Sequence, residues 1–331
     1  MSSGKPPHEL ERHLGTLRSI RPGPTLIVVA SIHGNEHAGI EASRRVLARL
    51  GRGDVKFKGD MVALVGNISA ARERRRYRTF DMNRVWTPAR VARIDEEVAS
   101  AEPVSVVAGF EGLEQRELLV AIRAAIAAAR GPIFMIDLHT TSAAGVPFVA
   151  CGTSAEQFAL IEHVPLPVIV GLESMVEGAL TGYWNGRGLT AVTVEGGQHD
   201  DPGTVDNLEA VLLLVLEAAG ILPLDSLDDV RAGERLLDSR RGDLPRTMEV
   251  LSRFAITEDQ QFTMEPGFRN VDYARASQLL ARDRNGDIRA ESDGVVILPL
   301  YQGQGNDGFF WGRAITAAEH PSRRALPTDA C

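Results

Sequence analysis

The chain has 331 residues, 44% of them hydrophobic and 24% charged, a composition typical of a soluble globular protein with one large domain or two ordinary ones. Its formal net charge of −8 argues against general binding of nucleic acid, and no apolar run reaches the roughly 18 residues of a membrane-spanning helix. Two cysteines exclude a disulfide framework and a thiolate-rich metal site. The first residues lack the apolar core of a secretory signal, so we expect a cytoplasmic protein.

Short apolar runs alternate with longer helical patterns from residue 25 to about 220. The runs predict strands buried on both faces, because they are almost continuously apolar, and they cover 25–31, 61–67, 133–139, 168–171 and 190–195. The helical patterns cover 37–50, 112–130 and 205–219. This alternation predicts the α/β class, with an open and at least partly parallel sheet.

The sequence changes character after about residue 240. Short strand-like runs, such as GVVILPLY at 294–301, are separated by the turn signals EPGF, DRNGD and SDG. We therefore expect a larger domain over residues 1–240 and a smaller, β-rich domain over residues 241–331.

Polar side chains follow four of the predicted strands at the point where each strand ends. They are His33, Asn67, the pair Asp137 and His139, and Glu195. In open α/β sheets, ligands bind beyond the carboxyl ends of the strands, so we expect these side chains to converge on one site. We expect Asn67 and Asp137 to support the residues that bind directly.

His33, Glu36 and His139 form a His/Glu/His set, which is a known catalytic zinc combination that leaves a fourth position for water. Zinc lowers the pKa of its bound water to about 7, and a neighbouring group must then handle the proton. Glu195 is the candidate for that role because it ends a buried strand. Asp137 shares a strand face with His139 and can hold its outer nitrogen.

The letters at 33–37, HGNEH, also match an inverted zinc-protease signature. In that alternative, His33 and His37 both bind zinc from one continuous helix, and the glutamate between them is the base. Gly34 and Asn35 are turn formers directly after a strand, which favours a helix that begins later. We therefore favour His33 and Glu36 as ligands and expect His37 to contribute least.

A second cluster of polar residues is the segment ARERRRYRTFDMNR at 71–84. One interpretation is a solvated basic loop in an arginine-rich chain. The other is a clamp for a substrate carboxylate, because arginine stays charged and binds carboxylates through two parallel hydrogen bonds.

The sequence resembles the succinylglutamate desuccinylase/aspartoacylase family of zinc carboxypeptidase-like hydrolases. The motifs that carry the resemblance are HGNE at 33–36, GN-S-A-RYRTFDMNR spread over 66–84, DLHTT at 137–141 and VEGGQH at 194–199. The resemblance implies a zinc-carboxypeptidase-like open mixed sheet with helices on both faces. It also implies a zinc-hydrolase catalytic domain over 1–240, followed by the β-rich domain over 241–331.

The resemblance also implies residue roles. The three ligands of one Zn²⁺ per chain are His33, Glu36 and His139. Glu195 activates the attacking water and then protonates the leaving amine. Arg76 polarises the scissile carbonyl and stabilises the oxyanion.

The remaining roles concern substrate binding. Asn83 and Arg84 correspond to the pair that binds the α-carboxylate of the amino acid. Arg187 and Tyr301 are further substrate-binding candidates, although Arg187 is slightly out of register. The family often has proline where Ile68 stands, so the acyl amino acid itself is not defined.

The function that this implies is a zinc-dependent amidohydrolase that cleaves the amide bond of an N-acyl amino acid by glutamate-assisted attack of zinc-bound water. The alternatives are a carboxypeptidase-like hydrolase of short peptides and a zinc-binding sensor module without catalysis. The expected partner is the small-molecule substrate, with neither nucleic acid nor membrane, and homo-oligomerisation is left open.

Overall fold

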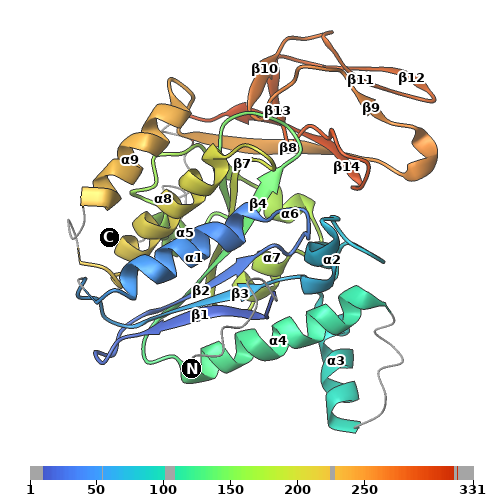
Figure 1. Ribbon diagram of the computed structural model, residues 1–331. Helices are drawn as coiled ribbons and strands as arrows, with labels where there is room; N and C mark the ends of the chain where they lie inside the picture. The colour runs from blue at the N-terminus through green and yellow to red at the C-terminus, as the bar shows by residue number, and fades with distance from the viewer. Residues whose placement is uncertain (1–9, 54, 101–108, 224–227, 317–318, 320–331) are drawn as a thin grey trace, which may run out of the picture.

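The structure is a computed structural model, which describes residues 10–53, 55–100, 109–223, 228–316 and 319. Its main feature is one mixed sheet that runs through the whole molecule (Figure 1). The strands of this sheet, in spatial order, are β1 (His13–Arg18), β3 (Asp60–Val65), β2 (Thr25–Ala30), β4 (Ile133–Thr141), β7 (Thr190–Gln198), β5 (Phe148–Cys151), β6 (Val168–Val170), β8 (Thr247–Ala255), β14 (Asp307–Ala314), β13 (Gly294–Ile297) and β10 (Asp272–Ala274).

The centre of the sheet is parallel. Strands β3, β2, β4 and β7 run in the same direction, and β1 pairs antiparallel with β3 at the edge. Every residue of β2 and β3 is buried, as expected for strands covered on both faces. All five strands predicted from the sequence are present, and β4 and β7 continue two or three residues beyond their predicted ends.

Helices cover both faces of the sheet. The helices, in chain order, are α1 (Ala38–Leu50), α2 (Ile68–Glu73), α3 (Pro88–Ser100), α4 (Phe110–Ala128), α5 (Ala155–Leu160), α6 (Leu172–Met175), α7 (Leu180–Asn185), α8 (Gly203–Ala218) and α9 (Asp228–Arg241), with 3-10 turns η1 (Met82–Arg84) and η2 (Glu258–Gln260). Alternate residues of β2 face opposite layers: Leu26 and Val28 join the core with α1 and α8, and Ile27 and Val29 join the core with α3 and α4. The predicted mixed α/β fold is confirmed.

The C-terminal part of the chain extends the same sheet. β8 pairs in parallel with β6, and β14, β13 and β10 then follow by antiparallel pairing. A separate three-stranded sheet, made of β12 (Gly286–Arg289), β11 (Leu279–Asp283) and β9 (Thr263–Met264), lies beyond them (Figure 1). The change of texture predicted near residue 240 coincides with the end of α9, but the sheet is not interrupted there. The tail with Cys331 lies outside the described residues.

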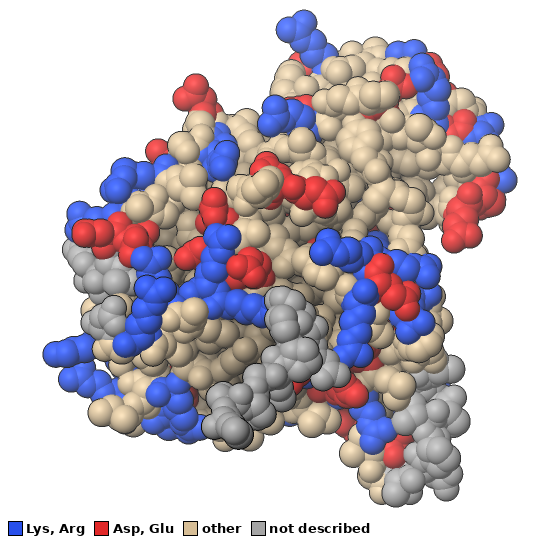
Figure 2. Space-filling model, in the orientation of Figure 1, with Lys and Arg blue, Asp and Glu red and all other residues tan. Residues whose placement is uncertain are grey.

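The surface shows no separation of charge on the face seen in Figure 2, where basic and acidic side chains are interspersed. Within the described ranges, none of the helices is both long enough and apolar enough to cross a membrane.

Candidate active site

The candidate site lies at the carboxyl ends of the central parallel strands. His139 and Glu195 are direct neighbours across β4 and β7, where their Cα atoms are register partners. His33 lies in the turn that follows β2, and Gly34 allows this turn to pack against α2. A Cβ at Gly34 would come within 2.2 Å of the backbone of Ala70, so a larger residue cannot occupy the position.

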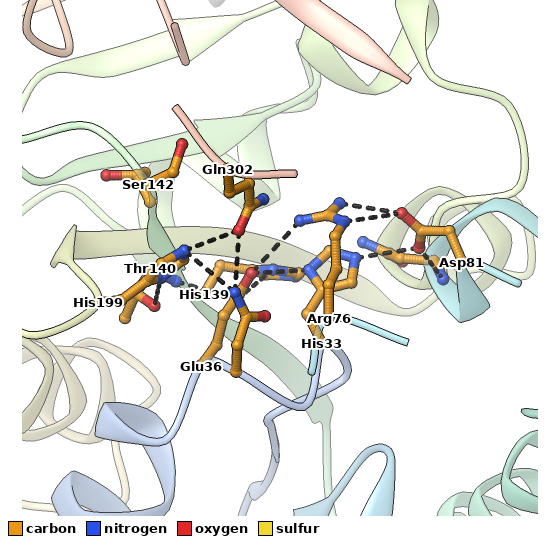
Figure 3. A network of polar contacts seen from close by, with 12 residues as sticks. His33, Glu36, Arg76, Asp81, His139, Thr140, Ser142, His199 and Gln302 are labelled. Atoms are coloured by element: carbon orange, nitrogen blue, oxygen red, sulfur yellow. Dashed lines mark hydrogen bonds and ion pairs between the residues drawn. The ribbon is translucent and has the colours of Figure 1, made fainter. Parts of the chain in front are cut away.

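Three buried side chains are placed to hold one metal ion. His33, Glu36 and His139 each offer a ligand atom, and these atoms lie within 4.8 Å of one another. The Glu36 carboxylate lies between the two imidazoles, with Oε1 2.8 Å from Nδ1 of His33 and Oε2 3.0 Å from Nδ1 of His139 (Figure 3). The backbone N–H of Thr140 also donates to Glu36 Oε2, at 3.0 Å. The three predicted ligands are thus brought together.

The outer ring nitrogen of each of the two histidines, His33 and His139, contacts a carboxylate. Nε2 of His33 lies 3.0 Å from Oδ1 of Asp81, and Nε2 of His139 lies 2.9 Å from Oδ2 of Asp137. These contacts direct both Nδ1 atoms toward Glu36, which is the arrangement that orients histidine ligands in metal sites. Burial alone would raise the pKa of Asp81, but His33 and Arg76 hold it well below its ordinary value. The donor set and its supports therefore fit a zinc ion.

Asp137 was predicted as a support for His139, whereas Asp81 was not. Asp81 also receives two hydrogen bonds from Arg76, through Nη2 at 2.9 Å and Nε at 3.2 Å. Arg76 Nη1 lies 3.7 Å from Glu36 Oε1, so the guanidinium is fixed at the edge of the metal cluster. Its position is therefore that of a fixed cation beside the ligand set.

The loop that carries Arg76 is held by a buried carboxylate on α4. Glu111 accepts hydrogen bonds from the backbone N–H groups of Arg78 at 2.6 Å and Thr79 at 2.8 Å. The side-chain amide of Asn67 donates to Glu111 at 3.3 Å, while its oxygen caps α2 at Ala70 N, 3.1 Å away. Asn67 makes no contact with the three predicted ligands, because its side chain is turned toward α2 and α4. Its predicted support is therefore indirect.

Glu195 is almost fully buried, and its Oε2 has no hydrogen-bond partner among the described residues. Burial, reinforced by the negative charge of Glu36, raises the pKa of Glu195 to about 8, although His139 and Arg76 lower it. The side chain lines the same cavity as the three predicted ligands. A buried carboxyl group with a free oxygen and a pKa near neutrality can both accept and deliver a proton.

The predicted carboxylate-binding pair lines the cavity as well. Asn83 accepts a hydrogen bond from Leu180 N at 2.8 Å, which ties it to the start of α7. Arg84 forms an ion pair with Asp307 of β14, with Nη2 2.5 Å from Oδ2, while its buried Nε has no partner among the described residues. The segment 71–84 therefore does not form a wholly solvated loop.

The structure brings neither Arg187 nor Tyr301 to the cavity wall. The guanidinium carbon of Arg187 lies 3.7 Å from the ring centroid of Tyr183, on which it stacks. The hydroxyl of Tyr301 donates to Glu265 O at 2.6 Å and accepts from Phe268 N at 3.0 Å, so it is turned toward that loop. Their predicted roles in substrate binding have no support in this arrangement.

Sequence reasoning missed a second polar network beside the cluster. Nδ1 of His199 lies 2.6 Å from the hydroxyl of Thr140, and its Nε2 lies 3.2 Å from Oε1 of Gln302 (Figure 3). Asn35 donates to the same Gln302 oxygen at 2.9 Å. Thr140 directly follows the ligand His139, and His199 ends the motif that begins at Val194, so proximity in sequence to known site residues was the available signal.

His37 takes no part in the metal cluster. It occupies the N-cap position of α1, and its Nε2 lies 3.0 Å from the carbonyl oxygen of Ala71. His33 lies in the preceding turn, so the two histidines do not share a helix. This geometry excludes the inverted zinc-protease alternative.

The cavity beside the cluster encloses about 860 Å³ of empty space, part of which is open to solvent. Its wall includes residues from the C-terminal strands and loops, which are Leu298, Pro299, Leu300, Gln302, Gly305, Asp307 and Phe310. Both parts of the chain therefore shape the site.

Comparison with known proteins shows the family to which this chain is similar. A sequence profile of the succinylglutamate desuccinylase/aspartoacylase catalytic domain matches residues 22–218. The succinylglutamate desuccinylase of Burkholderia pseudomallei (strain 1710b) is 28% identical over 284 residues, which cover 80% of this chain and 71% of that protein. The enzyme of the same name from Pseudomonas fluorescens (strain SBW25) is 31% identical over 139 residues, which cover 42% of this chain and 35% of that protein.

Solved structures show the same fold. The product-bound ectoine utilization protein EutE (DoeB) from Ruegeria pomeroyi superposes with a TM-score of 0.66 at 20% identity, covering 90% of this chain and 88% of that chain. The succinylglutamate desuccinylase from Chromobacterium violaceum gives a TM-score of 0.60 at 17% identity, covering 89% and 86%.

Proposed function

The chain belongs to the succinylglutamate desuccinylase/aspartoacylase family of hydrolases, and on that premise we propose that it is a zinc-dependent amidohydrolase that releases the acyl group of an N-acyl amino acid. The observation that carries the proposal is the buried Oε2 of Glu195, which has no hydrogen-bond partner among the residues that the structure describes and lies beside the His33, Glu36 and His139 cluster. We extend to this chain the zinc-carboxypeptidase-like architecture of the family, with a catalytic domain over 1–240 and a β-rich domain over 241–331.

In this proposal, the metal site polarises the scissile carbonyl of the substrate. His33, Glu36 and His139 would hold one zinc ion per chain, with Asp81 and Asp137 fixing the two imidazoles. A bound zinc would act as a Lewis acid on the scissile carbonyl and would lower the pKa of a water ligand.

Glu195 handles the proton. Its free Oε2 would accept the proton of the attacking water, and the protonated carboxyl group would then deliver it to the nitrogen of the leaving amine. Arg76 lies beside the cluster and can donate to the carbonyl oxygen as negative charge develops there. Asn83 and Arg84 are placed to bind the α-carboxylate of the amino acid.

Two alternatives fit the same residues less well. A hydrolase of short peptides needs an open cleft, whereas segments 298–302 and 305–310 contribute to the cavity wall and favour a small substrate. A sensor without catalysis would need neither the free carboxyl oxygen of Glu195 nor the fixed cation of Arg76.

The test combines metal content with turnover of N-acetyl, N-succinyl and longer N-acyl amino acids. We expect one zinc per chain and hydrolysis of some members of the panel. Glu195→Gln should lower kcat by about 100- to 10,000-fold and leave zinc content unchanged. The exposed Glu162 provides the matched control, and Glu162→Gln should keep full activity. Turnover that survives removal of the metal, or that Glu195→Gln leaves undiminished, overturns the proposal; zinc binding without any turnover favours the sensor.

A further inference from the structure

The cavity holds a second carboxyl group that the proposed mechanism does not use. Glu173 on α6 lines the cavity, and its partners are neutral: the side-chain amide of Asn185, at 3.2 and 3.3 Å, and the hydroxyl of Thr181. No arginine, lysine or histidine of the described residues forms an ion pair with it. Glu173 is half-buried, and a carboxylate with reduced access to solvent gains from a cationic partner, so this one is available for a cation that enters the cavity.

Glu173 is linked to the catalytic region by a short line of side chains. Thr181, which donates to Glu173, lies 3.1 Å from Thr193, hydroxyl to hydroxyl. Thr193 is two residues before Glu195 on β7, so both side chains project from the same face of the strand into the cavity. Two residues of strand span roughly 6.6 Å, which places the Glu173 carboxylate on the order of 10 Å from that of Glu195. A bound amino acid can bridge this distance, because hydrogen bonds of about 2.9 Å at its amine and at the tip of its side chain add to the length of the side chain.

Part of the cavity wall is apolar, although Thr181 and Thr193 lie between the two carboxyl groups. Ala150, Leu172, Val176 and Phe310 line it, and such a surface accommodates the methylene stem of a long side chain. Burial also raises the pKa of Glu173 above its ordinary value, against the hydrogen bonds from its neutral partners. An incoming ammonium group would therefore provide the opposite charge that this site lacks.

The proposed α-carboxylate clamp lies on the other side of the same short segment. Asn83 binds the N–H of Leu180, and the adjacent Thr181 binds Glu173. A substrate whose α-carboxylate lies at Asn83 and Arg84 would thus extend its side chain past Ala179 toward Glu173. In this proposal, the group that extends toward Glu173 is the side chain of the amino acid, not the acyl group.

The cavity offers little to a second carboxylate. Among the described residues, its wall contains two arginines and no lysine: Arg76 binds Asp81, and Arg84, which also pairs with Asp307, is assigned to the α-carboxylate. An anionic side chain would meet Glu173 without a free cation to offset the repulsion.

Resting on the proposed function, we infer that the enzyme selects N-acyl amino acids whose side chain combines an apolar stem with a cationic tip, as in ornithine or lysine, and that Glu173 is the residue that makes this selection. The cationic tip donates a charge-assisted hydrogen bond to the Glu173 carboxylate, while the stem packs on the apolar wall.

Four Nα-acetyl amino acids test the wild-type enzyme with zinc bound. Ornithine is cationic, norleucine is its neutral isostere, glutamine is neutral and polar, and glutamate is anionic. We expect kcat/KM for the ornithine compound to exceed that for the norleucine compound by about 10- to 100-fold, and the glutamate compound to be the poorest substrate.

Variants then assign the selection to one residue. Glu173→Gln should remove the advantage of ornithine, so that the ratio of kcat/KM for ornithine to that for norleucine falls close to one, because the charge-assisted bond is lost. Glu173→Arg should move the preference toward glutamate. Glu177, exposed in the next turn of the chain, gives the matched control: Glu177→Gln should keep the wild-type ranking.

The outcomes separate the two proposals. If the wild-type enzyme hydrolyses none of the wider panel of N-acyl amino acids, the proposed function itself fails. If it hydrolyses the glutamate compound as well as the ornithine compound, or if Glu173→Gln keeps the wild-type ranking, the selection by Glu173 is overturned while the amidohydrolase stands. Should the variants not fold, the wild-type ranking alone decides.

Discussion

The two sides of the cavity differ in how their carboxyl groups are paired: Glu36, Asp81 and Asp137 each contact a histidine, although Oδ1 of Asp137 has no partner among the described residues. On the metal side, both ring nitrogens of His33 and His139 have a carboxylate partner, and Glu36 contacts both rings. On the substrate side, and within the described part of the chain, Glu195 has an oxygen without a partner and Glu173 has only neutral partners. The metal side is thus fixed for one ion, whereas the substrate side keeps capacity for groups that arrive and leave.

The two arrangements have different consequences for rigidity and for stability. Fixed partners give a site rigidity, since each ligand is oriented before the ion binds. Unpaired buried groups destabilise the empty protein and are retained where chemistry needs them. The substitutions considered next change residues of the metal side first and of the substrate side last.

The largest effect should come from removing a ligand. His139→Ala deletes one of three ligand atoms and leaves Glu36 and Asp137 as two facing carboxylates without the imidazole between them. We expect zinc content to fall well below one per chain and kcat/KM to fall by about 1,000-fold or more, beyond what loss of an outer support costs. Metal analysis and turnover measure this. The exposed His163 serves as control, and a His139→Ala enzyme with full zinc content would contradict the ligand assignment.

The outer carboxylates should have a smaller effect. Asp137→Asn and Asp81→Asn each remove the charge behind one imidazole, and we expect zinc affinity to fall by about 10- to 100-fold. Asp81→Asn should also lower kcat, since Asp81 receives two hydrogen bonds from Arg76. Competition with a chelator measures the affinity. Equal kcat values for the two variants would show that the bond to Arg76 does not matter for catalysis.

Positioning of the arginine loop should matter less again. Glu111→Gln weakens the bonds to Arg78 N and Thr79 N, which fix the loop that carries Arg76. We expect kcat/KM to fall by about 10-fold with unchanged zinc affinity, because only the cation is displaced. Glu114, one turn along the same helix, binds Ile68 N and Ser69 N instead and is the matched control. A larger loss from Glu114→Gln would contradict this role.

The sequence allowed the metal side to be predicted because its residues follow strands with a clear pattern. The apolar runs before His33, His139 and Glu195 define parallel strands, and the carboxyl ends of such strands must share one edge of the sheet. Gly34 supplied the second signal, since a turn there prevents a helix that would join His33 to His37. Both features involve residues that are close together in the chain, so they can be recognised from the sequence alone.

The substrate side was harder to predict, because it depends on contacts between residues that lie far apart in the sequence. Gln302 reaches His199 from 103 residues away, and Glu173 faces the cavity from a helix of four residues. The family resemblance suggested Arg187 and Tyr301 as substrate-binding residues, but Arg187 stacks on Tyr183 and the hydroxyl of Tyr301 donates to Glu265 O. The pairing of β8 with β6 is equally non-local, and it joins the C-terminal strands to the main sheet.

The smallest predicted effect is on stability, and it concerns only the substrate side of the cavity. In the metal-free protein, folding raises the pKa of Glu195 from an ordinary 4.5 to about 8. The folded state therefore holds this proton more tightly than the unfolded state, and its contribution to stability is lost as pH rises from about 4.5 through about 8. Glu195→Gln cannot ionise, so its stability advantage over the wild type should grow across this window and stay constant above it. We expect melting temperatures within a degree or two of each other at pH 5, and a variant that melts a few degrees higher at pH 9. Thermal unfolding in the presence of a chelator measures both. A wild-type protein that gains stability relative to the variant as pH rises would show that Glu195 is ionised and paired in the folded state, and the contrast between the two sides of the cavity would then not hold.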